Sequence, residues 1–118
     1  MTTKLLQFVN RKRDMPKKRA ESIRLKDFNE IYNDFNESEA KKQAGRCSQC
    51  GVPFCQVHCP LQNNIPDWLK LAAENRLEEA YEVSQSTNNF PEICGSICPQ
   101  DRLWEGNCVI EKGFESVT

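Results

Sequence analysis

Hydrophobic positions in the middle of the chain predict an amphipathic helix. Apolar residues recur there at i, i+3, i+4 and i+7: Ile65, Trp68, Leu69 and Ala72. This spacing places them on one helical face, and Pro66 lies where a proline in the first turn is tolerated. No segment alternates between apolar and polar residues with a period of two, so we expect no strand. The fold class is therefore predicted to be all-α.

Two helices are predicted in the first half of the chain. Five apolar residues at helical spacing indicate a short amphipathic helix: Leu25, Phe28, Ile31, Tyr32 and Phe35. Asn36 then precedes Glu39 by three residues, which is typical of a capping box. We expect this cap to begin a helix that runs from about Glu37 to Arg46.

Two more helices are predicted after residue 74. Asn75 precedes Glu78 by three residues and is expected to cap a helix with four residues on its inner face: Leu77, Ala80, Tyr81 and Ser84. Pro91 is expected to open the last helix, which contains Ile93 and Ile97. We expect three aromatic side chains to pack in the core: Trp68, Tyr81 and Phe90.

The composition is polar for a domain of this size. Of the 118 residues, 38% are hydrophobic and 28% are charged, so we expect cross-links to support a modest core. No run of 18 apolar residues exists, which excludes a membrane span, and the first residues lack the apolar segment of a signal peptide. We therefore expect a cytoplasmic protein whose seven cysteines hold metal instead of forming disulfides.

The two parts of the chain differ in charge. Residues 1–46 carry 12 Lys/Arg against 7 Asp/Glu, whereas residues 47–118 carry 4 against 10 and hold every cysteine. We predict one domain that consists of a basic helical arm, 1–46, and a cysteine-rich module, 47–118. The arm contains two basic triplets, 11–13 and 17–19, but no aromatic residues interleave them. We therefore expect the arm to contact protein and not nucleic acid.

The cysteines follow a ferredoxin-like spacing. The first group reads Cys47-x2-Cys50-x4-Cys55-x3-Cys59-Pro60. In bacterial ferredoxins the cysteine before the proline binds the other of two clusters. The same ending returns at Cys94-x3-Cys98-Pro99, and Cys108 is a remote seventh thiol. The two endings therefore predict two metal sites.

Zinc is the alternative to iron–sulfur, because thiolates suit both. A zinc ribbon needs two CxxC pairs, and Cys47–Cys50 is the only such pair here. The spacing therefore favours iron–sulfur, with a structural or interaction module that holds zinc or a single cluster as the alternative. His58 lies next to Cys59 and is expected not to be a ligand.

The chain resembles the N-terminal domain of the NADPH-dependent glutamate synthase small subunit and the related domain of dihydropyrimidine dehydrogenase. The segments that carry this resemblance are 46–55 (RCSQCGVPFC), 59–61 (CPL), 65–68 (IPDW), 87–92 (TNNFPE), 98–103 (CPQDRL) and 105–108 (EGNC). The resemblance implies an alpha-helical ferredoxin-type domain with [4Fe–4S] clusters. It also implies that electrons pass from NADPH to FAD and then through the clusters to the large subunit of glutamate synthase.

The resemblance implies a ligand set for each cluster. The first cluster would be held by four thiolates: Cys47, Cys50, Cys55 and Cys108. The second would take Cys59 and Cys98, but the family pattern has another cysteine where this chain has Trp104. We therefore expect one complete [4Fe–4S] cluster and an incomplete second site, with Cys94 as a candidate substitute ligand.

The resemblance also places the catalytic chemistry outside this chain. No GxGxxG motif occurs, so FAD and NADPH are expected only in a downstream flavoprotein portion. We expect no catalytic residue here, and two protein partners: that flavoprotein portion and the large subunit. The pattern leaves open whether the chain forms a homo-oligomer and whether it is a fragment or a free-standing module.

Overall fold

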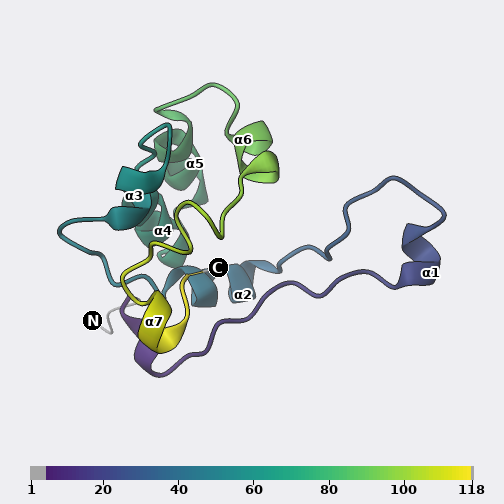
Figure 1. The fold of residues 1–118 in the computed structure, drawn as a ribbon, viewed down its shortest axis with the longest axis horizontal. Helices are drawn as coiled ribbons and strands as arrows, with labels where there is room; N and C mark the ends of the chain where they lie inside the picture. Colours follow the sequence, from purple (N-terminus) through teal and green to yellow (C-terminus); the bar gives the residue numbers. More distant parts are fainter. Residues whose placement is uncertain (1–4, 118) are drawn as a thin grey trace.

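Helices make up the regular structure of residues 5–117, the part of the chain that this computed structural model describes (Figure 1). The 3-10 turn η1 (Gln7–Val9) is followed by α1 (Glu21–Arg24), α2 (Glu37–Ala44), α3 (Phe54–His58), α4 (Ile65–Ala73), α5 (Leu77–Gln85), α6 (Pro91–Ile97) and α7 (Glu111–Phe114). Within the described residues, β pairing is limited to one isolated bridge between Lys18 and Tyr32. The all-α prediction is therefore confirmed.

Helix α4 lies at the centre of the body, where it packs against α2 and α5. Of the predicted face, Ile65 and Leu69 are buried and Ala72 is partly buried, and Ala73 is buried in addition. Ala44 of α2 belongs to the same core, and Trp68 packs against it from a partly buried position. The core is small, so only a few side chains anchor the cysteine loops around it.

One predicted helix cap is confirmed and another is wrong. The side chain of Asn36 accepts a hydrogen bond from the backbone N–H of Glu39 at 2.8 Å, and α2 begins as predicted but ends at Ala44. Asn75 does not cap α5, because Arg76 is the residue before that helix and no side chain caps it. Asn75 instead adopts a left-handed conformation with φ 64°, which asparagine tolerates, directly after α4.

The helix predicted over residues 25–35 is wrong. Helix α1 ends at Arg24, and Phe28 is fully exposed. Asp27 explains the break, because its carboxylate accepts bonds from the backbone N–H of Asn29 at 3.0 Å and from the guanidinium of Arg19 at 3.1 Å. Local side-chain bonds of this kind compete with helix formation.

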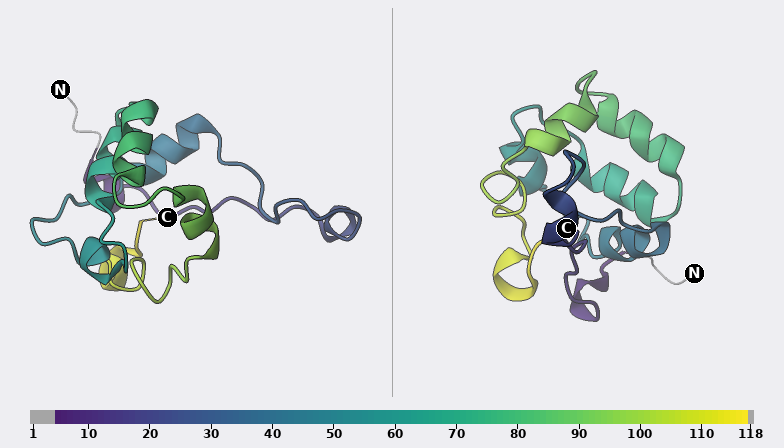
Figure 2. Two further views of the ribbon diagram at one scale, coloured as in Figure 1. Left: turned by 90° about the horizontal axis from the view of Figure 1, so that it is seen from above. Right: turned by 90° about the vertical axis from the view of Figure 1, so that its right-hand side faces the viewer.

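Residues 15–36 form an arm that extends from the body and carries α1 at its tip (Figures 1 and 2), whereas residues 11–14 are hydrogen-bonded to the body. Its two sides are paired, because the N–H of Arg19 donates to the carbonyl of Ile31 and the N–H of Asn33 donates to that of Lys17, both at 2.8 Å. The arm is thus held by backbone hydrogen bonds. The predicted boundary at residue 46 stays a prediction.

Two aromatic residues lie outside the core, contrary to prediction. Tyr81 is 56% exposed and Phe90 is 59% exposed. Helix α5 packs against α4 and buries only Ala80, and Phe90 precedes α6, a helix without a buried residue, so both aromatic side chains remain at the surface. In the described part of the chain, no helix is long and apolar enough to cross a membrane.

Candidate metal centre

The two Cys-x3-Cys-Pro segments have the same local shape. Helix α3 ends at Cys59 with φ −75° and ψ 123°, and α6 ends at Cys98 with φ −63° and ψ 125°. Proline follows each cysteine and disfavours helical geometry at the residue before it, so the chain leaves both helices in an extended conformation. Each unit therefore presents one cysteine from a helix and one from the turn that follows it.

Four of the seven thiols line one cavity. These are the residues that the resemblance assigned to the first cluster: Cys47, Cys50, Cys55 and Cys108. The rest of the lining is almost entirely apolar, with side chains from α4, from the loop before Cys108 and from the C-terminal segment: Phe54, Ile65, Pro66, Leu69, Trp104, Val109 and Val117. The fold thus joins Cys108 to three thiols more than 50 residues earlier.

The cavity makes two of these thiols, Cys47 and Cys55, poor acids while no metal is bound. Burial raises the pKa of Cys47 and raises that of Cys55 to about 11, and the neighbouring thiols add to both shifts. A thiolate is disfavoured in such an apolar space because it loses hydration and repels its neighbours. Bound iron would offset both costs, since metal binding releases the thiol protons.

Hydrogen bonds aimed at sulfur come from the two residues between Cys47 and Cys50. Gln49 donates to the Cys47 sulfur from its backbone nitrogen at 3.5 Å and from Nε2 at 3.3 Å. Nε2 also lies 2.7 Å from the carbonyl of Pro66, and the hydroxyl of Ser48 lies 2.9 Å from the Cys50 sulfur. Sequence reasoning missed both residues, although a polar pair inside a CxxC motif was a signal for them.

Arg46 ties the first cysteine loop to the C-terminal segment. Its side chain is completely buried, and Nε donates to the carbonyl of Arg11 at 3.0 Å. The two terminal nitrogens donate at 2.6 to 2.8 Å to three further carbonyls, those of Phe114, Glu115 and Ser116. Burial lowers the pKa of Arg46, but a guanidinium stays charged. The pattern of apolar positions carried no signal for this buried arginine.

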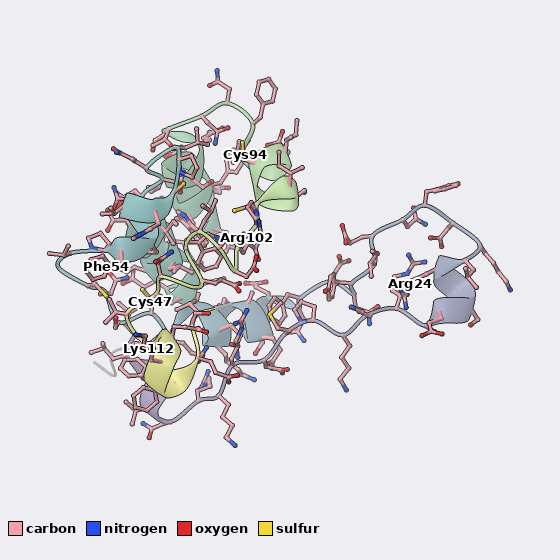
Figure 3. All side chains as sticks on the ribbon, viewed as in Figure 1. Arg24, Cys47, Phe54, Cys94, Arg102 and Lys112 are labelled. Atoms are coloured by element: carbon pink, nitrogen blue, oxygen red, sulfur yellow. The ribbon has the colours of Figure 1, made fainter. Side chains whose placement is uncertain are left out.

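The remaining thiols form a second group. Burial raises the pKa of Cys98, and the thiols of Cys59 and Cys94 raise it further. Cys94 lies on α6, well separated from Cys47 in Figure 3. Trp104, at the position where the resemblance implies a cysteine, acts on Cys98 in the opposite direction. The polar side chain of Trp104 lowers the pKa of the Cys98 thiol and so opposes part of this rise.

The arrangement of the four thiols in the first group indicates whether the site suits a single metal ion or a cluster. Among the described residues, no three His, Cys, Asp or Glu side chains converge on the position of a single metal ion. The Nδ1 atom of His58 lies 2.9 Å from the carbonyl of Phe54 in its own helix, and the expectation that this residue is not a ligand stays a prediction. The four thiols of the first group surround a common space instead, which fits a cluster of several iron atoms.

Comparison with known proteins shows the class of this domain. A family model described as dihydropyrimidine dehydrogenase domain II, 4Fe–4S cluster, matches residues 24–118, and the chain belongs to this family of iron–sulfur domains. The resemblance noted in the sequence is therefore confirmed, and the domain is of the [4Fe–4S] type.

Particular relatives are small chains of glutamate synthase (NADPH). The protein from Azospirillum brasilense is 69% identical over 109 residues, which are 92% of this chain and 23% of that protein. The protein from Escherichia coli is 49% identical over 118 residues, which are 100% of this chain and 25% of that protein. That from Halomonas elongata is 46% identical over 95% of this chain and 24% of its own length. The chain thus spans about a quarter of the length of these relatives.

Proposed function

We propose that this chain is the electron-transfer domain of a glutamate synthase-type oxidoreductase. One observation carries the proposal: the four cysteines assigned to the first cluster line a single cavity. Cys47 and Cys50 come from the loop between α2 and α3, Cys55 comes from α3, and Cys108 comes from the other end of the module. A [4Fe–4S] cluster supplies a one-electron redox couple when four thiolates hold it.

The residues around the first site have definite roles in this proposal. Gln49 and Ser48 direct polar hydrogens at the sulfurs of Cys47 and Cys50, which stabilises thiolate charge and raises the reduction potential. The apolar lining from α4, with Ile65 and Leu69, excludes water from the cluster. Arg46 holds the C-terminal segment so that Val117 closes one side of the cavity.

A second cluster is proposed at the other cysteine group. Cys59 and Cys98 are the two ligands that the family pattern supplies, and Cys94 lies close enough for its charge to act on Cys98. With Cys94, the second site has three thiolates. Without it, only the two thiolates of the family pattern would remain, because Trp104 stands in the place of a third. We therefore assign Cys94 as the substitute ligand and expect the second cluster to bind less tightly than the first.

The electron donor and acceptor belong to other parts of the enzyme in this proposal. The matched relatives are small chains of an NADPH-dependent glutamate synthase, and this chain corresponds to about a quarter of each. Electrons would enter from NADPH and FAD in a flavoprotein portion and leave to the large subunit, in the cytoplasm. The 118 residues alone are expected not to oxidise NADPH, with or without added FAD.

The arm is proposed as a protein contact surface. Residues 15–36 carry 5 Lys/Arg against 4 Asp/Glu, and the tip exposes Leu25 and Phe28. The bond between Arg19 and Asp27 holds the turn that presents them. An arm with apolar side chains at its tip suits a protein surface with an apolar depression, on the flavoprotein portion or the large subunit.

Metal analysis and spectroscopy of the anaerobically purified chain test the proposal. We expect a brown protein with about four iron atoms from the first cluster and additional iron from the second. The reduced protein should show electron paramagnetic resonance (EPR) signals of reduced clusters. One or two zinc ions with no iron would instead show a structural zinc module and contradict electron transfer.

A further inference from the structure

The side chain of Asn63 links two loops that are 21 to 24 residues apart in the sequence. Its amide nitrogen donates to the carbonyl of Ser84 at 2.6 Å and to the hydroxyl of Thr87 at 2.9 Å. Its amide oxygen accepts a hydrogen bond from the indole N–H of Trp68, also at 2.9 Å. The loop before α4 is thus bonded to the end of α5 and to the turn that follows it.

Asn63 follows closely after the first Cys-x3-Cys-Pro unit. Cys59 ends that unit, and its carbonyl accepts a hydrogen bond from the N–H of Gln62 at 2.8 Å, which closes a turn around Pro60. The carbonyl of Asn63 then accepts a bond from the N–H of Ile65, also at 2.8 Å, where α4 begins. The backbone between Cys59 and the Asn63 amide is therefore held by hydrogen bonds.

The turn after α5 leads into the second Cys-x3-Cys-Pro unit. Asn88 follows Thr87, and its side-chain oxygen accepts a hydrogen bond from the N–H of Phe90 at 2.6 Å and lies 3.7 Å from the sulfur of Cys94. The carbonyl of Phe90 accepts a bond from the N–H of Cys94 at 3.1 Å in the first turn of α6. Hydrogen bonds thus connect the two units through the amide of one asparagine.

Apolar packing does little to hold the two units together, because neither α3 nor α6 has a buried residue. Polar bonds have to supply the connection instead. The Asn63 side chain is half-buried beside Trp68, which packs against the core. Water therefore competes less for the bonds of this amide than it would at an open surface.

We propose that Asn63 is a positioning residue for the second metal site: it holds the Cys59 turn and helix α6 in the relation that a shared cluster requires. The inference rests on the proposed function, in which Cys59, Cys94 and Cys98 hold that cluster. Residues that orient ligands contribute to metal affinity, because mobile ligands would have to be ordered when the metal binds. The side chain of Asn63 bonds to the two loops and not to a sulfur, so it acts through the loops that it joins.

Substitutions of similar shape test this role. Asn63→Asp keeps the acceptor for Trp68 but loses both donors. Asn64→Asp is the matched control, because it adds the same charge one residue later, where the side chain donates only to Asp67 at 2.6 Å. Thr87→Val removes one acceptor of the Asn63 amide, whereas Thr87→Ser keeps the hydroxyl.

Iron analysis and EPR of the reduced, anaerobically purified chain measure the effect on each site. For Asn63→Asp we expect a several-fold loss of the second-site signal and an unchanged first-site signal. Cys94→Ser identifies the second-site signal, which it should remove. Thr87→Val should cause a smaller loss of the same signal, and both Thr87→Ser and Asn64→Asp should match the wild-type protein. Since Thr87→Val breaks a bond that Asn63→Asp has already removed, the double variant should be no worse than Asn63→Asp alone.

Amide hydrogen exchange followed by mass spectrometry measures the connection between the loops directly. In Asn63→Asp, exchange should rise about tenfold in residues 59–64 and 84–98, because two hydrogen bonds that hold these segments are lost. Exchange in residues 43–50, in the loop of the first site, should stay unchanged. Asn64→Asp should leave all three segments as in the wild-type protein.

Several results would overturn the inference. An unchanged second-site signal in Asn63→Asp would remove the positioning role, and an equal loss of both signals would show general destabilisation instead. A wild-type protein with about four iron atoms and one signal would show that no second cluster forms, and it would leave electron transfer through the first cluster standing. A protein without iron would contradict the proposed function and the inference with it.

Discussion

The body and the arm of this molecule are stabilised in different ways. In the body, Arg46 is buried and satisfies four backbone carbonyls, and four thiols line an apolar cavity. In the arm, backbone pairing and the bond between Arg19 and Asp27 hold a turn whose apolar residues face solvent. The body is arranged to enclose a cofactor, and the arm is arranged to present a surface. Substitutions in the body should therefore change stability and iron content, whereas substitutions at the tip of the arm should change affinity for a partner.

The largest effect is expected from Cys108→Ser. This substitution removes the thiol that joins the C-terminal part of the module to Cys47, Cys50 and Cys55 across about 50 residues of sequence. We expect loss of the first cluster and unfolding of much of the body, because metal binding contributes to the free energy of folding. Iron analysis and circular dichroism would measure both.

Cys94→Ser is the matched control for this change. We expect it to remove only the second cluster and to leave the body folded, since Cys94 lies on α6, outside the first cavity. Equal losses in Cys94→Ser and Cys108→Ser would mean that the assignment of the thiols to two sites is wrong.

The next effect is expected from Arg46→Met. Methionine has a similar length but no donors, so four carbonyls, one of them fully buried, lose their charged partner. We expect the free energy of unfolding of the iron-loaded protein to fall by about 3 kcal/mol or more, because a hydrogen bond to a charged group contributes about 1.5–3 kcal/mol. Denaturant unfolding would measure this change. Lys42→Met, on an exposed side of α2, should cost far less, and a similar loss in both variants would contradict the role of Arg46.

In the arm, the double substitution Leu25→Ser and Phe28→Ser should leave stability and iron content unchanged. Both side chains are almost fully exposed, so they contribute little to the fold. Affinity for the flavoprotein portion or the large subunit should fall about tenfold or more, as expected when apolar anchors are removed from an interface. Titration calorimetry with each purified partner would measure it, and Leu77→Ser on α5 serves as an exposed control. Unchanged affinity for both partners would show that the tip is not a contact surface.

The smallest effect concerns pH. The bond to Arg19, with a further contribution from the N–H of Asn29, holds the pKa of Asp27 below its ordinary value of 3.8. A lowered pKa means that this carboxylate stabilises the turn above pH 3.8 and that the contribution is lost as the pH falls through the folded value. NMR shifts of the Arg19 and Asn29 amides should report the loss. Asp27→Asn should abolish this pH dependence, and a persisting transition would assign it to another group.

Several features could be predicted from local sequence because local physics decides them. The spacing of Ile65 and Leu69 predicted α4, and Asn36 predicted the start of α2 through its bond to Glu39. The repeated Cys-x3-Cys-Pro pattern predicted two units of the same shape, since proline forces the preceding cysteine out of the helix. The resemblance added Cys108 to the first group, and the structure places that thiol at the cavity.

Other features were decided by side-chain contacts that the spacing of apolar residues does not show. Leu25 and Phe28 have helical spacing, but the bond between Asp27 and Arg19 fixes a turn instead, and no core residue covers them. Nothing near Arg46 in sequence shows that its side chain is buried, because its partners are carbonyls about 70 residues later. Trp104 looked like a missing ligand, and only the fold shows that its side chain lines the cavity of the first cysteine group. Residue spacing determines which thiols one turn can present, whereas the folded path of the chain determines what surrounds them.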